Sequence, residues 1–227
     1  MHRARGNFVY RNLANATSLL GVLPLIILFL DNGYQYVIPL IIFNNFIDDL
    51  DGVLAAKLNI RSRFGADLDN VCDAVAHISL ALAVGAHFGS FLMVAGAIAA
   101  GAILVRTVSR LQPTTIGGTG SQTNELMRHM LFAVLLAGQF GFSPEYILMA
   151  VFLLHSVTML VPYKMPNPII DGATSAKMLG LVNAALLAAW LVPTVTPIIA
   201  AAFIGAYLYS LIVGSIARAK VPSSASA

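Results

Sequence analysis

The sequence predicts an all-α integral membrane protein built as a polytopic helical bundle. Of its 227 residues, 58% are hydrophobic and 10% are charged, whereas a soluble domain has about 25% charged residues. The same composition excludes intrinsic disorder, because disordered chains are rich in charge and poor in apolar residues. At roughly 20 residues per crossing, the chain has room for about eight transmembrane helices and for little else. We therefore expect a single membrane domain over residues 1–227.

Eight apolar segments have the length of membrane-crossing helices. They lie at residues 14–31, 35–57, 67–87, 89–110, 125–140, 144–162, 174–192 and 196–217. Residues that favour turns separate some of them, as in Asp31-Asn32-Gly33 and from Pro193 to Pro197. The other breaks between apolar segments contain Lys or Arg.

The basic residues predict the orientation. All 13 Lys and Arg residues occur near the termini or at alternate breaks: Arg3, Arg5, Arg11, Lys57, Arg61, Arg63, Arg106, Arg110, Arg128, Lys164, Lys177, Arg218 and Lys220. The opposite breaks contain Asp31 and Glu145 but no cation. Because cations beside helix ends favour the cytoplasm, we expect an even number of crossings with both termini cytoplasmic. The alternative interpretation of the first segment is a signal peptide, but no clear cleavage site precedes Asp31.

The charge and the cysteine content exclude some partners and sites. The net charge is +3, without a run of consecutive basic residues, so nucleic acid is not an expected partner. The single Cys72 excludes an intrachain disulfide and a cysteine-based metal site. We expect it to be a buried thiol.

Six of the ten acidic residues lie in one short stretch. They are Asp48, Asp49, Asp51, Asp67, Asp69 and Asp73. A carboxylate at membrane depth costs roughly 2.5–3.5 kcal/mol, so this concentration needs an explanation. On a helix, Asp48 and Asp51 share a face with two small residues, Gly52 and Ala55. Gly65, Asp69 and Asp73 then follow at spacings of four on the next helix.

Four carboxylates on two helix faces would repel one another unless divalent cations lie between them. Oxygen ligands select hard ions such as Mg²⁺, Mn²⁺ or Ca²⁺. We therefore predict a metal site. Asp49 and Asp67 point elsewhere and are expected to be solvated at the membrane interface. An acidic rim paired with Lys57, Arg61 and Arg63 is the alternative, which explains one aspartate better than four.

The pattern Asp48-x-x-Asp51-Gly52-x-x-Ala55, followed by Gly65-x-x-x-Asp69-x-x-x-Asp73, resembles the signature of the CDP-alcohol phosphatidyltransferases. These are integral membrane enzymes of phospholipid synthesis. The resemblance implies transfer of a phosphatidyl group from CDP-diacylglycerol to a small alcohol, with release of CMP and the assistance of two divalent ions, Mg²⁺ or Mn²⁺. It also implies the roles of individual residues. Asp48, Asp51, Asp69 and Asp73 would bind the metals, Asp73 would be the general base, and Gly52, Ala55 and Gly65 would adjoin the CDP moiety.

The chain departs from this signature at one position. The family has Arg directly after the alanine, where this chain has Ala56. Lys57 is adjacent but lies about 100° around the helix, so it replaces the charge only if its long side chain bends back. We include Lys57 among the candidate CDP contacts. An inactive family member is the alternative that this departure raises.

The candidate acceptor residues lie later in the chain. Arg106 and Arg110 share a helix face and are predicted either to bind a phosphate of the donor lipid or to extend to lipid headgroups. The polar segment 112–125 contains Ser121 and Asn124 and is expected to line an acceptor pocket or to be a simple connector. His129 is expected to be an interfacial histidine.

Three segments indicate which acceptor alcohol is favoured. Arg106-x-x-x-Arg110, the run Gly120-Ser121-x-Thr123-Asn124 and the segment from Met159 to Lys164 most resemble the phosphatidylserine synthase branch. Serine is therefore the favoured acceptor, with a phosphatidylcholine synthase as the alternative. The resemblance further implies the cell (inner) membrane, a cytoplasmic active site and a homodimer.

Two non-enzyme classes are the alternatives to an enzyme. A small transporter would also place acids in the membrane, but here they gather at one end and no broken-helix pattern lies at mid-membrane. A structural scaffold explains the hydropathy and leaves the aspartates unexplained. His77, His87 and His155 lie apart on apolar helices and are expected to pack, and small residues such as Gly96, Gly101 and Gly180 are expected at helix or dimer contacts.

Overall fold

The computed structural model describes residue 10 and residues 12–112, 118–166 and 176–219, and this part of the chain is helical without a strand. Its eight α-helices are α2 (Leu13–Val22), α3 (Val37–Lys57), α4 (Arg63–Phe88), α5 (Ser90–Leu111), α6 (Thr123–Phe140), α7 (Glu145–Leu160), α8 (Ala176–Leu191) and α9 (Thr196–Ala219). Three 3₁₀ helices supplement them: η1 (Leu23–Phe29), η2 (Gly33–Tyr36) and η3 (Pro193–Val195). The all-α prediction is confirmed, and each predicted segment contains one α-helix.

The first predicted segment changes its helix type half-way along. The α-helical part ends at Val22, and η1 continues from Leu23 with Pro24 in its first turn. Because proline has no backbone N–H and its ring crowds the preceding turn, it ends the regular α-helical hydrogen bonding at this point. Asn32 then turns the chain with a left-handed backbone, at φ 61°.

Among the described residues, three helical segments are long and apolar enough to cross a membrane: Arg63–Phe88, Ser90–Leu111 and Pro193–Ala219. Shorter apolar helices occupy Leu13–Phe29, Glu145–Leu160 and Ala176–Leu191. These findings support a membrane protein. The number of crossings and the orientation of the termini stay predictions.

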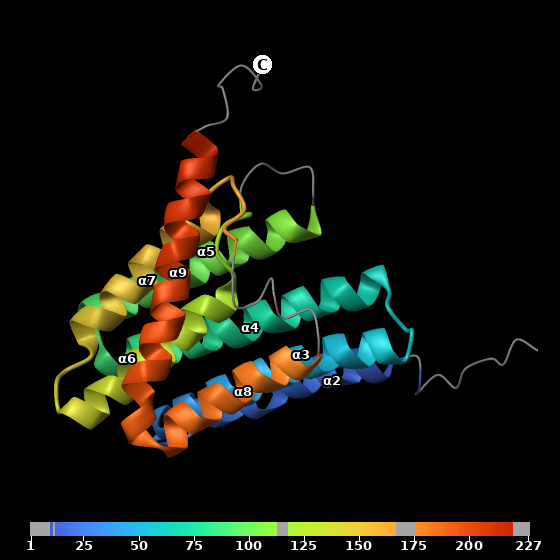
Figure 1. The fold of residues 1–227 in the computed structure, drawn as a ribbon. Coiled ribbons are helices and arrows are strands. Elements are labelled where there is room, and N and C mark those ends of the chain that lie inside the picture. Colours follow the sequence, from blue (N-terminus) through green and yellow to red (C-terminus); the bar gives the residue numbers. More distant parts are fainter. Residues whose placement is uncertain (1–9, 11, 113–117, 167–175, 220–227) are drawn as a thin grey trace, which may run out of the picture.

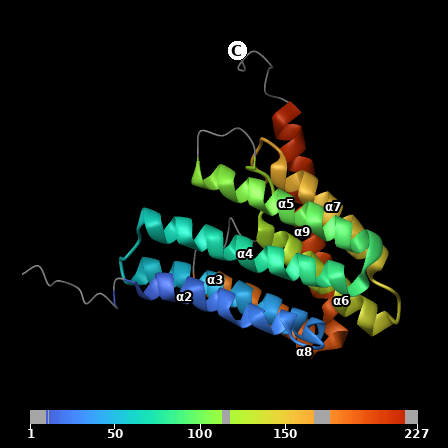
Figure 2. The same ribbon diagram turned by 180° about the vertical axis from the view of Figure 1, so that it is seen from behind.

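The helices form a bundle in which α2, α3, α4 and α8 run alongside one another, α5 and α7 lie beyond α4, and α9 crosses at a steep angle (Figures 1 and 2). Large apolar side chains such as Ile41, Leu80 and Phe152 fill its core. Gly96 lets α5 approach α4 closely, because a Cβ at this position would lie 2.9 Å from the carbonyl oxygen of Ala81. The small-residue prediction is therefore met at Gly96 by a helix contact within the chain.

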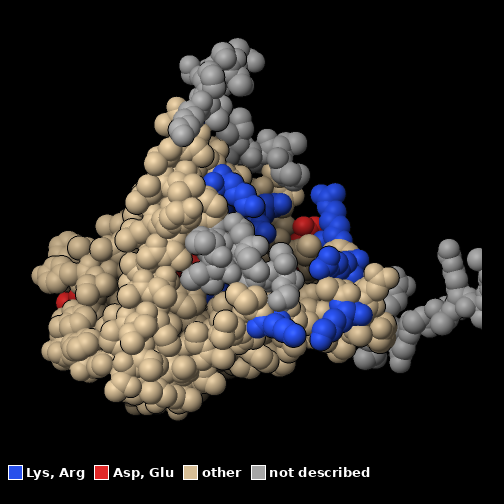
Figure 3. All heavy atoms as spheres, viewed as in Figure 1, with Lys and Arg blue, Asp and Glu red and all other residues tan. Residues whose placement is uncertain are grey.

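One end of the bundle carries the α3–α4 connection, the C-terminal end of α5 and the N-terminal ends of α6 and α8 (Figures 1 and 2). Lys and Arg gather at this end in the space-filling view (Figure 3). Arg106 and Arg128 lie in α5 and α6, inside the predicted segments 89–110 and 125–140, but both are buried, at 6% and 3% exposed. Arg3, Arg5, Arg11 and Lys220 lie outside the described residues.

Candidate active site

The short connection between α3 and α4 brings the aspartates of the two helices together. Ser62 starts α4 as its N-cap, with Oγ accepting a hydrogen bond of 2.9 Å from the backbone nitrogen of Gly65. Such a cap fixes where the helix begins. The faces carrying Asp48 and Asp51 on α3 and Asp69 on α4 consequently meet near the end of the bundle.

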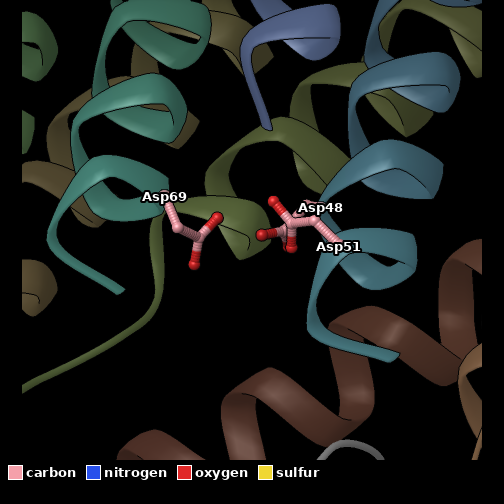
Figure 4. A group of neighbouring side chains, drawn as sticks. All are labelled: Asp48, Asp51 and Asp69. Carbon is pink, nitrogen blue, oxygen red and sulfur yellow. The ribbon is translucent and has the colours of Figure 1, made fainter. Parts of the chain in front are cut away.

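Asp48, Asp51 and Asp69 point toward one another across this junction (Figure 4). One carboxylate oxygen from each lies within 4.8 Å of the others, and Asp51 is only 5% exposed. Within the described part of the chain, no Lys or Arg forms an ion pair with any of the three. Three converging carboxylates without a cationic partner repel one another, and a set of hard oxygen donors suits a divalent ion. The residues therefore fit the predicted metal site.

Asp73 lies one turn further along α4. Its carboxyl group is within hydrogen-bonding reach of Asp48, but it is not a member of the mutually close group of three. Its roles as fourth ligand and as general base stay predictions.

Two polar side chains from other helices hold the acidic group. Asn124 on α6 donates a hydrogen bond of 2.8 Å to Asp48, and Ser18 on α2 donates one to Asp51. Asn124 was predicted as an acceptor contact, whereas the structure places it against a carboxylate. Ser18 was not predicted, because one serine in the apolar segment 14–31 has no distinguishing pattern, and only the packing of α2 against α3 brings it to Asp51.

Asp49 and Asp67 lie outside the group of three, as expected. Asp67 is half-buried, and its Oδ2 lies 3.9 Å from Nε of Arg63. Asp49 is partly buried, and Asn183 on α8 donates a hydrogen bond of 2.5 Å to its carboxylate. This contact was not predicted, and solvation of the rest of the Asp49 carboxylate stays a prediction.

A cavity of about 240 Å³ opens beside the acidic group, between α2, α3 and α4. Its lining includes Asp51, Asp69 and the three small residues that the sequence analysis placed beside a nucleotide, Gly52, Ala55 and Gly65. A Cβ added at Gly52 would meet no atom within 4 Å, because this position faces open space. The structure thus brings two of the carboxylates together with a recess that small residues line in part.

The family model for CDP-alcohol phosphatidyltransferase matches residues 11–161. The chain belongs to the CDP-alcohol phosphatidyltransferase family. A search of curated proteins found no matching relative. The matched region contains the aspartates and the cavity, whereas α8 and α9 lie beyond it.

Two cations of this CDP-alcohol phosphatidyltransferase, Lys57 and Arg61, line cavities beside α3. Lys57 lines a second cavity, of about 440 Å³, together with Asp48, Asp49 and Ala56. Arg61, which the sequence analysis considered only as an orientation signal or a rim partner, lines both this cavity and the first one. Its position in the short α3–α4 connection is the signal that could have singled it out.

The other predicted substrate residues of the phosphatidyltransferase are separated from one another. Arg110 is close enough to Asp48 and Asp69 to act on them electrostatically. Arg106, one turn earlier, donates a hydrogen bond of 2.6 Å to the carbonyl of Gly118. Ser121 is buried against Thr158 of α7, with its Oγ 3.1 Å from the threonine hydroxyl. The structure therefore places Arg110 within electrostatic range of the acidic group and engages Arg106 and Ser121 with the protein itself.

The expectation of an interfacial His129 was wrong, since α6 buries this side chain and its Nδ1 lies 2.7 Å from the carbonyl oxygen of Glu125. His77 and His155 are buried within the bundle, in agreement with the packing prediction. His87 stacks on Tyr34, with ring centroids 3.6 Å apart. Cys72 is a buried free cysteine, as predicted.

Proposed function

We propose that this protein transfers a phosphatidyl group from CDP-diacylglycerol to a small alcohol, with serine the favoured acceptor, and releases CMP. The observation that supports this most strongly is the convergence of Asp48, Asp51 and Asp69, of which Asp51 and Asp69 line the cavity of about 240 Å³. Membership of the phosphatidyltransferase family supports the class of reaction.

Asp48, Asp51 and Asp69, with Asp73 as a fourth ligand, would hold two divalent cations, Mg²⁺ or Mn²⁺. Bound there, the cations would polarise the phosphoryl group and neutralise the charge of the leaving phosphate. Within the described residues, the three carboxylates have no competing Lys or Arg partner, so their oxygens are available for this purpose.

The surrounding residues would bind the donor and move one proton. Gly52, Ala55 and Gly65 leave room for the CDP moiety against the helices, while Arg61 faces the same cavity with a positive charge. The acceptor hydroxyl oxygen forms a bond to the phosphorus that carries diacylglycerol, and the bond from that phosphorus to the bridging oxygen breaks. CMP leaves with the bridging oxygen, and Asp73 takes the hydroxyl proton. Proton transfer of this kind contributes about 10²- to 10⁴-fold to a rate.

The acceptor is the finer part of the proposal. Its support is the likeness of three sequence segments to phosphatidylserine synthases, and Arg110 beside the acidic group adds a cation suited to an anionic substrate group. Choline is the second candidate acceptor. We further propose a homodimer in the cell (inner) membrane with the site on the cytoplasmic side, since the Lys and Arg of the described residues gather at the same end as the aspartates (Figure 3).

The deciding experiment measures CMP release by the purified protein. CDP-diacylglycerol and Mg²⁺ or Mn²⁺ would be supplied with serine, choline, inositol phosphate or glycerol phosphate in turn. We expect metal-dependent CMP release with serine, and its loss in Asp69→Asn. The matched control is Asp67→Asn, which changes an aspartate of the same helix outside the group of three and is expected to retain activity.

Three outcomes would contradict the proposal at different levels. Release with another acceptor alone would replace serine and keep the reaction. Binding of CDP-diacylglycerol without CMP release under all conditions would indicate an inactive family member. Metal-coupled ion flux in vesicles, without CMP release, would favour a transporter.

A further inference from the structure

A chain of hydrogen bonds, buried at α6 and partly buried at α8, leads from α6 through α3 to α8. It begins at an ion pair on α6, in which Nη1 of Arg128 lies 3.0 Å from Oε1 of Glu125 and the two side chains are 4% and 5% exposed. Arg128 directs two further donors, Nε and Nη2, at Oδ1 of Asn45, at 3.1 and 2.9 Å. Its guanidinium also lies 5.8 Å from the ring centroid of Phe203 on α9.

Because arginine can only donate, it fixes the orientation of each amide group in this series of hydrogen bonds. Arginine only donates, so Asn45 must present its oxygen to Arg128 and turn its amide nitrogen the other way. That nitrogen lies 2.9 Å from Oδ1 of Asn183 and 3.4 Å from Oδ2 of Asp49. Asn183 accepts with its oxygen and donates with its nitrogen, again to Oδ2 of Asp49. Two amides thus direct N–H groups at one carboxylate oxygen.

These contacts hold α3 from two sides. Asp48 and Asp49 are adjacent in sequence and therefore point about 100° apart around the helix. Asn124 of α6 holds Asp48, and Asn183 of α8 holds Asp49. A rotation of α3 about its axis would break one of these bonds and would also turn Asp48 and Asp51 away from Asp69 on α4.

Asn183, the last residue in this series of hydrogen bonds, lies outside the region that the family model matches. The family model ends at residue 161, whereas Asn183 belongs to α8. The helices α3 and α8 pack against each other along the bundle (Figure 1). The C-terminal part of the chain therefore reaches the element that carries two members of the acidic group.

We propose that Asn183 is a positioning residue for the acidic group. Together with Asn45 and Arg128 it holds α3 at the rotation in which Asp48, Asp51 and Asp69 converge and bind divalent cations. Asn183 itself touches neither the cations nor the substrate. The inference rests on the metal-binding role in the proposed function.

The test measures binding of Mn²⁺ alone to the full chain in lipid nanodiscs, by the loss of the free-ion electron paramagnetic resonance signal. Residues that orient metal ligands typically contribute about 10- to 100-fold to metal affinity. We expect Asn183→Leu to weaken Mn²⁺ binding by about 10-fold. The matched control is Thr196→Val, which removes the 2.6 Å hydrogen bond to the Ala189 carbonyl at the other end of α8. Mn²⁺ binding by Asn183→Leu that equals that of the control would overturn the inference.

A swap of the two partners keeps the test valid if Asn183→Leu does not fold. Asn183→Asp alone places two carboxylates face to face and is expected to bind Mn²⁺ weakly. The double variant D49N/N183D again pairs an amide with a carboxylate, so most of the affinity is expected to return. A double variant as weak as the single one would also refute the positioning role.

A kinetic measurement separates this inference from the proposed function. In an active enzyme, Asn183→Leu should raise the Mn²⁺ concentration needed for half-maximal CMP release and leave the KM for CDP-diacylglycerol unchanged. A higher KM with unchanged metal dependence would contradict the inference alone. Wild-type protein that binds Mn²⁺ but releases no CMP would contradict the proposed function alone, and wild-type protein that binds no Mn²⁺ would contradict both.

Discussion

The amide nitrogen of Asn124 on α6 lies 2.8 Å from a carboxylate oxygen of Asp48 on α3. The two residues are 76 positions apart in the sequence, yet this bond holds one member of the acidic group, on a different side of α3 from the α8 contact. Asp48 therefore has a defined direction before any cation binds, which reduces the rearrangement that metal binding requires.

Asn124→Ala removes this donor and should weaken the metal site. Hydrogen bonds to charged groups contribute about 1.5–3 kcal/mol, which corresponds to a decrease in kcat/KM of at least about 10-fold. The measurement is CMP release as a function of Mg²⁺ concentration, where a higher half-maximal concentration is expected. Gln122→Ala, which removes an amide two residues earlier, is the control, and equal effects of the two changes would argue against the role of Asn124.

Asp73→Asn should abolish turnover and leave donor binding largely intact. The amide cannot accept the proton of the attacking hydroxyl, while its size and its position near Asp48 are retained. CMP release and the binding of CDP-diacylglycerol would be measured on the same preparation. Retained turnover would refute the assignment of Asp73 as the base.

Gly52→Leu should raise the KM for CDP-diacylglycerol without unfolding the protein. A Cβ at this position meets no atom within 4 Å and points into the space that the donor would occupy. Leucine favours a helix over glycine by about 0.8–1 kcal/mol, so the melting temperature should not fall. Gly101→Leu is the control, because this glycine on α5 also faces open space. An unchanged KM would show that the donor lies elsewhere.

Arg61→Gln should weaken donor binding more than Lys57→Gln does. Arg61 lines both cavities beside α3, whereas Lys57 lines only the one that lacks Asp51 and Asp69. Loss of a cation that faces a diphosphate should raise the KM for CDP-diacylglycerol by about 10-fold, the equivalent of about 1.4 kcal/mol. The KM of each variant at low and high salt is the measurement. A larger effect of Lys57→Gln would reverse the assignment and favour the second cavity.

Most of the fold follows from local properties of the chain. Eight apolar segments predicted eight helices, and turn residues predicted several of the ends, because hydropathy and turn preference depend on neighbours in sequence. Helical spacing also indicated which aspartates face one way. Asp48 and Asp51 share a face with Gly52 through periodicity alone, and the structure finds these residues on one side of α3.

The remainder of the site depends on which helices become neighbours. The sequence could not predict that Ser18 meets Asp51, that Asn183 meets Asp49, or that Arg128 is buried in an ion pair with Glu125. Each of these residues is polar, and in the sequence alone it would be assigned to the surface or to the membrane interface. Only packing reveals that one satisfies the other.

The sequence by itself determined the membrane class, the helical segments and the acidic pattern that identifies the family, because composition and short-range spacing carry these properties. The tertiary structure decided which carboxylates converge, which cation faces the cavity and which helices hold α3 in place. Those outcomes depend on side chains far apart in sequence coming within a few ångströms of one another. Helical periodicity determines which side chains share one face of a helix, and only the packing of the bundle determines which helix that face contacts.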